Sequence, residues 1–144
     1  LVVAALQPER RVTLVDSRRL RTEWLERAVA ALDLGNVEVV LARVEDLPER
    51  TASVISARAF APLPRLLEGA GRFSTEKTRW LLPKGRNARA ELESIAAAWQ
   101  KLFHVEQSLT DADAAILVGT GRVAPIGARQ APRRKIERRH RSKR

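Results

Sequence analysis

The chain has 144 residues, about the length of one domain. Hydrophobic residues make up 44% of it, enough for a core, and the absence of cysteine excludes a disulfide framework and a thiolate metal site. No apolar run approaches the roughly 18 residues of a membrane span, and the first residues lack the pattern of a signal peptide. We therefore expect a folded cytoplasmic protein.

The positive charge of the chain is unevenly distributed. The net charge of +10 is typical of a nucleic-acid partner. Residues 129–144, however, hold nine basic residues and one acid, so the remainder is close to neutral. We expect a domain over residues 1–120 and a basic, disordered tail over residues 121–144. The tail either engages RNA phosphates or only adds solubilising charge.

Patterns of buried strands alternate with helical patterns along the chain. Such alternation favours an α/β domain with a mainly parallel sheet. The helix expected over residues 20–34 has an apolar face, and Gly35 ends it. That face comprises Trp24, Leu25, Ala28, Val29 and Leu32. The other predicted helices are the end of one at 1–6, a short one at 62–73 and a longer one at 88–102. The predicted strands are 11–17, 37–42, 52–60, 78–85 and a late hairpin of 103–109 with 114–120.

Ligands of parallel α/β sheets bind beyond the carboxyl ends of the strands. Asp16 follows the first predicted strand and either accepts ribose hydroxyls or serves as an acid at a helix N-terminus. Val44 and Glu45 follow the second strand and suit an adenine edge, unless they form an ordinary acidic turn. Arg58 ends the third strand, where we expect it to be half-buried and to need a carboxylate or ligand partner. Lys84, before Gly85, either faces a phosphate or lies in a solvated loop.

The sequence offers no metal site, nucleophile–base pair or glycine-rich phosphate loop. His104 and His140 are the only histidines, and neither has a ligand-like neighbour in sequence. We therefore predict no metal and no catalytic base.

Four motifs together resemble one protein family. They are "TLVDS" at residues 13–17, "NVEVVLARVEDLP" at 36–48, "SARAFAPLPRLL" at 56–67 and "LLPKG" at 81–85. In this order and spacing they are similar to the glucose-inhibited division protein B family. The resemblance implies a Rossmann-like class I methyltransferase fold that uses S-adenosylmethionine to methylate N7 of a guanine in 16S ribosomal RNA.

The resemblance also implies roles for individual residues. Asp16, Val44, Glu45 and Arg58 match cofactor-binding positions. Arg21 matches a basic residue of the family, whereas the family's usual lysine beside it is Leu20 here. RNA contacts are expected at Arg18, Arg19, Arg21 and Lys84.

The family pattern begins upstream of Leu1, with a first strand and a glycine-rich loop. We expect this chain to be a truncated form that starts after that loop. The strands at 11–17 and 37–42 should then be separated from those at 52–60 and 78–85. We expect this 144-residue chain by itself to bind the cofactor poorly and to be a monomer. A methyltransferase with another substrate and a non-catalytic RNA-binding module remain alternatives to a methyltransferase of the small ribosomal subunit.

Overall fold

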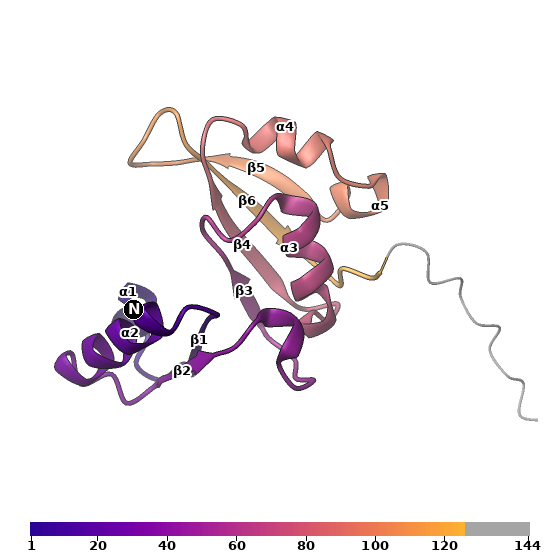
Figure 1. The fold of residues 1–144 in the computed structure, drawn as a ribbon. Helices are drawn as coiled ribbons and strands as arrows, with labels where there is room; N and C mark the ends of the chain where they lie inside the picture. The colour runs from indigo at the N-terminus through magenta and orange to yellow at the C-terminus, as the bar shows by residue number, and fades with distance from the viewer. Residues whose placement is uncertain (126–144) are drawn as a thin grey trace, which may run out of the picture.

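A computed structural model describes residues 1–125 of the chain, so residues 126–144 of the tail predicted over 121–144 lie outside the described residues. The strands form two separate sheets, one of two strands and one of four (Figure 1). Their order is β1-β2 in the first sheet and β3-β4-β6-β5 in the second. The strands are β1 (Val12–Asp16), β2 (Val37–Leu41), β3 (Val54–Ser56), β4 (Arg79–Lys84), β5 (Phe103–Gln107) and β6 (Ala115–Thr120).

We call residues 1–50 the N-terminal unit. Its strands β1 and β2 are parallel, with Val12 opposite Val37 and Asp16 opposite Leu41, so their carboxyl ends lie together. The crossover between them is helical, as is usual for parallel strands. The side-chain amide of Asn36 donates to three backbone carbonyls around the end of the first helix, which ties that helix to the start of β2. The helical segments are α1 (Val2–Leu6), α2 (Arg19–Ala31) and the 3-10 turn η1 (Val44–Asp46).

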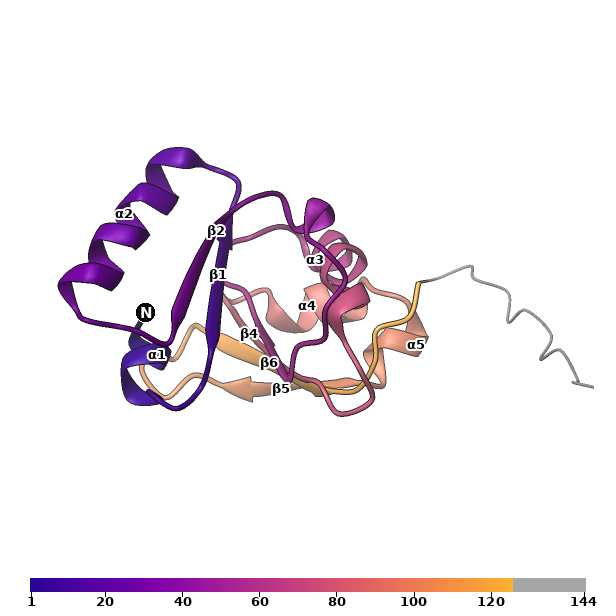
Figure 2. The same cartoon turned by 90° about the horizontal axis from the view of Figure 1, so that it is seen from below.

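We call residues 51–125 the C-terminal unit. β3 and β4 are parallel, and β6 inserts between β4 and β5 antiparallel to both. The late strands therefore form the predicted hairpin. Three helices cover one face of this sheet (Figures 1 and 2), and a single cluster of buried side chains joins them to it. They are α3 (Leu63–Ala70), α4 (Ala88–Glu93) and α5 (Ala97–Gln100), and the 3-10 turn η2 (Gly71–Phe73) follows α3.

α3 shows why this sequence packs as it does. Pro64 lies in its first turn, where a missing backbone N–H costs nothing. Its leucines at positions 63, 66 and 67 recur at helical spacing and are all buried. Gly69 lies inside this helix. A Cβ there would approach Val44 Cγ1 at 3.1 Å, so the glycine lets α3 pack closely against η1.

The helix predicted over residues 88–102 is wrong as a continuous element. It breaks into α4 and α5, because Ala96 has an extended backbone, with φ −59° and ψ 141°. The side-chain amide of Gln100 donates to the carbonyls of Glu93 and Ile95 at 3.1 and 2.7 Å. The Ser94 hydroxyl donates to Glu91 O at 2.7 Å. These side chains replace the backbone bonds of a continuous helix.

Two expectations for the N-terminal unit are also corrected. The strand predicted over residues 11–17 forms, but none of β1 is fully buried. Of the apolar face predicted for α2, Trp24 and Leu32 are 56% and 58% exposed. Both differences arise because little of the chain over residues 1–125 covers this unit.

The predicted separation between the two pairs of strands is confirmed. β1 is paired only with β2, and β3 only with β4, so each leaves one edge unpaired within the described chain. A cavity of about 870 Å³ lies between the two sheets. Its walls include Val12 and Val15 from β1 and Val54 and Ile55 from β3.

The C-terminal unit continues beyond residue 120, where we expected the tail to begin. Val123 is buried, and its N–H donates to the Ser74 hydroxyl at 2.9 Å. The indole N–H groups of Trp80 and Trp99 donate to Gly121 O and Ala124 O. Residues 121–124 are therefore part of the folded unit.

Candidate functional site

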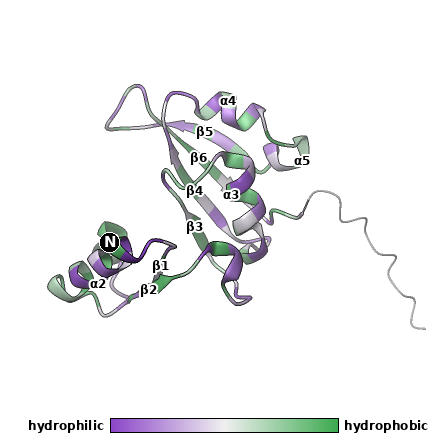
Figure 3. Ribbon diagram, viewed as in Figure 1, coloured by the Kyte–Doolittle hydropathy of each residue, from purple (hydrophilic) through white to green (hydrophobic). Residues whose placement is uncertain are grey.

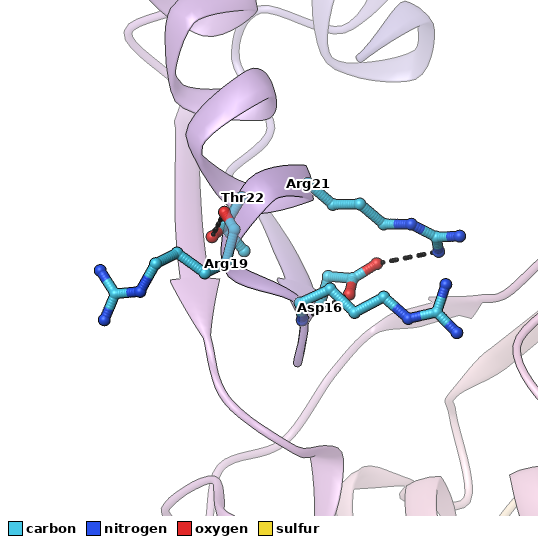
Figure 4. A network of polar contacts seen from close by, with 5 residues as sticks. Asp16, Arg19, Arg21 and Thr22 are labelled. Atoms are coloured by element: carbon cyan, nitrogen blue, oxygen red, sulfur yellow. Dashed lines mark hydrogen bonds and ion pairs between the residues drawn. The ribbon is translucent and has the colours of Figure 1, made fainter.

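Asp16 is the last residue of β1 and lies at the entrance to α2. Its Oδ1 accepts a hydrogen bond from the backbone N–H of Arg18 at 2.8 Å, and its Oδ2 lies 3.4 Å from Arg21 Nη1 (Figure 4). The Asp16 side chain is 25% exposed. The carboxylate is thus held in place by the turn, while part of it stays open to solvent and can accept further hydrogen bonds.

Three arginines follow Asp16 in the turn and the first turn of α2. Arg18, Arg19 and Arg21 are all exposed. Arg21 extends toward Asp16, whereas Arg19 points to the other side of the helix (Figure 4). The contact between Arg21 and Asp16 is a surface ion pair, which contributes little stability. Arg18 and Arg19 remain available for an anionic partner.

Val44 and Glu45 lie in η1, three residues after the carboxyl end of β2. Arg72 fixes this turn, because its guanidinium donates to Glu45 O at 2.8 Å and also to Leu47 O. The Val44 side chain is half-buried against α3, while the Glu45 carboxylate is exposed and lies 3.8 Å from Arg43 Nε. Since β1 and β2 are adjacent parallel strands, Asp16 and this turn lie at the same end of one sheet.

Arg58 differs from its predicted environment. It is exposed, and it makes no hydrogen bond or ion pair with another described side chain, so the prediction of a half-buried guanidinium is wrong. The reason is that β3 ends at Ser56, and Arg58 belongs to the following turn. In that turn Ala59 has φ 52°, a left-handed conformation that is uncommon for a residue with a Cβ.

Lys84 is the last residue of β4 and is largely buried. Its Nζ lies 2.7 Å from Glu91 Oε2 of α4, and the two side chains are 12% and 33% exposed. Gly85 follows in an exposed turn. Lys84 thus lies in a partly enclosed pair with a carboxylate, rather than in the open loop that we considered.

A second cavity, of about 620 Å³, lies at the carboxyl ends of β3 and β4. It brings together Arg58 and Lys84, which the sequence predicted, with Phe60 and Glu91, which it did not. Phe60 is 51% exposed, and it also borders the cavity between the sheets. Asp16, Val44 and Glu45 border no part of this second cavity.

Two absences apply to the described part of the chain. Among residues 1–125, no three His, Asp or Glu side chains are grouped to hold a metal ion. His104 is exposed and paired with Glu106 at 2.9 Å, and His140 lies outside the described residues. Within the same range, every helix is too short or too polar to span a bilayer.

The arrangement of strands and helices defines the class of the fold. The structure is similar to that of an S-adenosylmethionine-dependent methyltransferase, SibL, in its apo form. The TM-score is 0.61 at 14% sequence identity, and the match covers 83% of this chain and 47% of SibL. The chain therefore has the Rossmann-like fold of that class.

Sequence comparisons are more specific. The family model described as rRNA small subunit methyltransferase G matches residues 1–117, and the chain belongs to this family. The enzyme of that name from Novosphingobium aromaticivorans is 57% identical over 139 residues, which cover 93% of this chain and 60% of the relative. The one from Erythrobacter litoralis is 61% identical over 122 residues, which cover 85% and 59%. The chain thus spans about three fifths of the length of these relatives.

Proposed function

We propose that the protein transfers a methyl group from S-adenosylmethionine to N7 of a guanine in small-subunit ribosomal RNA. One structural observation carries the proposal: Asp16 and the Val44–Glu45 turn follow adjacent parallel strands at the same end of a sheet. That is where α/β folds of this class bind nucleosides. The family to which the chain belongs supplies the reaction class and the kind of RNA.

The side chains at this end of the sheet fit the nucleoside half of the cofactor. A carboxylate accepts two hydroxyl protons, and the exposed part of Asp16 suits the two hydroxyls of a ribose. Glu45 offers a second acceptor, and the turn that carries it is fixed by Arg72. Val44 offers an apolar surface beside it. Arg58, at the cavity beyond the carboxyl ends of β3 and β4, is exposed and could face either the cofactor or the RNA.

The chemistry places modest demands on the protein. Guanine N7 carries a lone pair and is nucleophilic without losing a proton, so no catalytic base is required. S-adenosylmethionine supplies an activated methyl group when bound. The protein's own residues then have to hold the base in line with that group and exclude water.

We expect basic side chains of the protein to contact the negatively charged phosphates of the RNA. The exposed Arg18 and Arg19 at the start of α2 can contact phosphates independently of sequence. Arg21, Lys84 and the basic residues beyond 125 are further candidates. We further propose that the protein is a cytoplasmic monomer that meets the small ribosomal subunit or its RNA.

Asp16→Asn in the complete gene product tests the cofactor site. We expect S-adenosylhomocysteine to bind about 10- to 100-fold more weakly, because hydrogen bonds to a charged acceptor are lost. Asp33→Asn is the matched control, since Asp33 is exposed beyond the other end of α2. Calorimetry measures both variants. It also tests the prediction that the 144-residue chain alone binds the ligand poorly, and micromolar affinity of that chain would refute this expectation.

Methylation of small ribosomal subunits that lack the modification tests the substrate. Methylation at guanine N7 supports the proposal. Cofactor binding without methylation of ribosomal RNA would favour a methyltransferase with another substrate. Failure of the complete product to bind the cofactor would favour a non-catalytic RNA-binding module.

A further inference from the structure

The cavity at the carboxyl ends of β3 and β4 contains three features whose chemistry suits a purine base. Its volume of about 620 Å³ is ample for one nucleotide. Its walls are apolar at Phe60 and Pro83, and four charged residues line it, Arg58, Lys84, Glu91 and Asp111. A mixture of flat apolar surface and a few fixed polar groups is typical of small-molecule sites.

Phe60 is the first feature. An aromatic side chain of this size is normally buried, but Phe60 is 51% exposed at the rim of the cavity. It directly follows Ala59, whose left-handed backbone directs the chain at this turn. Strained backbone of this kind persists only where the surroundings impose it, and it is concentrated at functional sites. An exposed ring at the mouth of a cavity offers a face on which a base can stack.

Glu91 is the second feature, and Lys84 the third. One carboxylate oxygen, Oε2, is held by Lys84 Nζ at 2.7 Å. The other oxygen accepts no hydrogen bond from any residue in the described part of the chain. Because Lys84 is only 12% exposed, its charge both positions the carboxylate and balances it. Glu91 therefore presents a fixed, charged acceptor at the cavity wall.

We propose that this cavity holds the target guanine, with Phe60 stacked on the base and Glu91 accepting hydrogen bonds from its N1–H and N2 amino groups. The inference rests on the proposed function and assigns the base-recognition residues within it. Guanine is the base that presents two adjacent donors on its Watson–Crick edge. A carboxylate therefore accepts from guanine and faces an unprotonated ring nitrogen, a repulsive acceptor, in adenine.

The proposed contact also agrees with the chemistry at N7. N7 lies on the edge of the purine opposite N1 and N2. A carboxylate bound at the Watson–Crick edge therefore leaves N7 free to face the methyl donor. Lys84 acts as a positioning residue that orients Glu91, and it needs no direct contact with the base.

The test combines a change in the protein with a change in the RNA. The complete gene product and its Glu91→Gln variant are assayed on small-subunit RNA carrying guanosine or inosine at the methylated position. Inosine keeps N7 and N1–H but lacks the N2 amino group. We expect each single change to lower kcat/KM about 10- to 100-fold, the discrimination that one bidentate contact provides. We expect the two changes together to cost much less than the product of the two effects.

The role of Phe60 is tested with two substitutions, one that removes the aromatic ring but keeps an apolar side chain and one that keeps the ring. Phe60→Leu should lower kcat/KM about tenfold or more, and Phe60→Tyr should retain activity, because base–aromatic stacking needs a ring. Glu93→Gln and Leu109→Ala are matched controls. Glu93 is an exposed acid on the same helix, and Leu109 is fully exposed in the loop between β5 and β6. Calorimetry with S-adenosylhomocysteine should be unchanged in all variants, and thermal unfolding should be unchanged in the Phe60 variants and the two controls. Glu91→Gln should lower the melting temperature, because the largely buried Lys84 loses its carboxylate partner.

The outcomes separate this inference from the function on which it rests. The inference is supported if the effects of Glu91→Gln and inosine on kcat/KM are coupled. It also requires that Phe60→Leu lowers kcat/KM and that Phe60→Tyr retains it. Two results would overturn the inference while guanine methylation, and so the proposed function, stays intact. One is that the effects of Glu91→Gln and of inosine are independent of each other. The other is that Phe60→Leu keeps full activity. Cofactor binding without guanine methylation by the unaltered protein overturns both.

Discussion

The two units of the molecule differ in how they bury their apolar side chains. The core cluster lies entirely within the C-terminal unit, from Leu63 to Val123. In the N-terminal unit the buried apolar residues are Ala4 and Leu47, and the strands are only half-buried. Several of its large apolar side chains face solvent on α1 and α2. They are Val2, Val3, Leu6, Leu20, Trp24 and Leu32. Figure 3 colours parts of the ribbon of these helices green, the colour of hydrophobic residues.

This difference shows that a regular element can form without a core of its own. β1 and β2 keep their full parallel register, and α2 spans 13 residues. Yet hydrophobic burial provides most of the driving force for folding. The C-terminal unit should therefore contribute most of the free energy of unfolding of the described chain. The same substitution should lower that free energy more in the C-terminal unit than in the N-terminal unit.

The largest predicted contrast is between two tryptophans. Trp80 is fully buried in β4, packs edge-on against Phe103 with ring centres 6.0 Å apart, and donates to Gly121 O. Trp80→Ala should lower the free energy of unfolding by about 3–5 kcal/mol, because it leaves a large cavity. Urea denaturation followed by circular dichroism measures the loss.

Trp24→Ala is the matched change in the N-terminal unit. Because Trp24 is 56% exposed, the free energy of unfolding should change by no more than about 0.5 kcal/mol. A loss of several kcal/mol from Trp24→Ala would show that the N-terminal unit is stabilised by contacts that the described chain does not reveal, and the comparison would fail.

Two glycines give a smaller contrast of the same kind. A Cβ at Gly119 of β6 would lie 2.5 Å from Phe103 Cδ1 and 2.8 Å from Leu102 O, whereas one at Gly35 would meet nothing within 4 Å. Gly119→Ala should cost about 1–3 kcal/mol of unfolding free energy through overpacking. Gly35→Ala should cost nothing measurable. Thermal unfolding of both variants checks this, and equal melting temperatures would contradict the tight packing of β6 against β5.

Local patterns in the sequence predicted most elements but not their environment. β1 and β2 were predictable because short β-branched runs are bounded by charged residues and by Gly35. The break between α4 and α5 was not, since it depends on Gln100 reaching back to carbonyls. Arg58 was placed in a strand because its apolar neighbours continue the pattern, although pairing with β4 ends at Ser56.

The candidate site shows the same limit. The ligand end of each strand could be located from the sequence, so Asp16, Glu45 and Lys84 could be selected as candidates. Their partners could not. In the sequence, the helix that contains Glu91 looks like an ordinary surface helix. Only the packing of α4 on the sheet places Glu91 beside Lys84. Phe60 is exposed because of the turn at Ala59, which no local pattern indicated.

The smallest prediction concerns Glu38 on β2, in the N-terminal unit. The hydroxyl of Thr13 on β1 donates to Glu38 Oε2 at 3.1 Å, and Arg50 Nη1 lies 3.2 Å from the same oxygen. The Thr13 hydrogen bond, followed by that from Arg50, lowers the pKa of Glu38 below its usual value of 4.5. Its contribution to stability is therefore present above that value and disappears as the pH falls through the folded-state pKa.

NMR titration of the Glu38 carboxyl carbon measures this shift. Thr13→Val and Arg50→Gln should each raise the pKa of Glu38, because the hydrogen bond from Thr13 and the hydrogen bond and charge of Arg50 all lower it. High salt should reduce the effect of Arg50, since exposed charges are screened, and should leave the effect of Thr13. Because Thr13 and Glu38 lie directly opposite each other on β1 and β2, the shift also reports whether the two strands stay paired. An unchanged pKa in Thr13→Val would indicate that this pairing is open in solution, the extreme form of the difference between the two units.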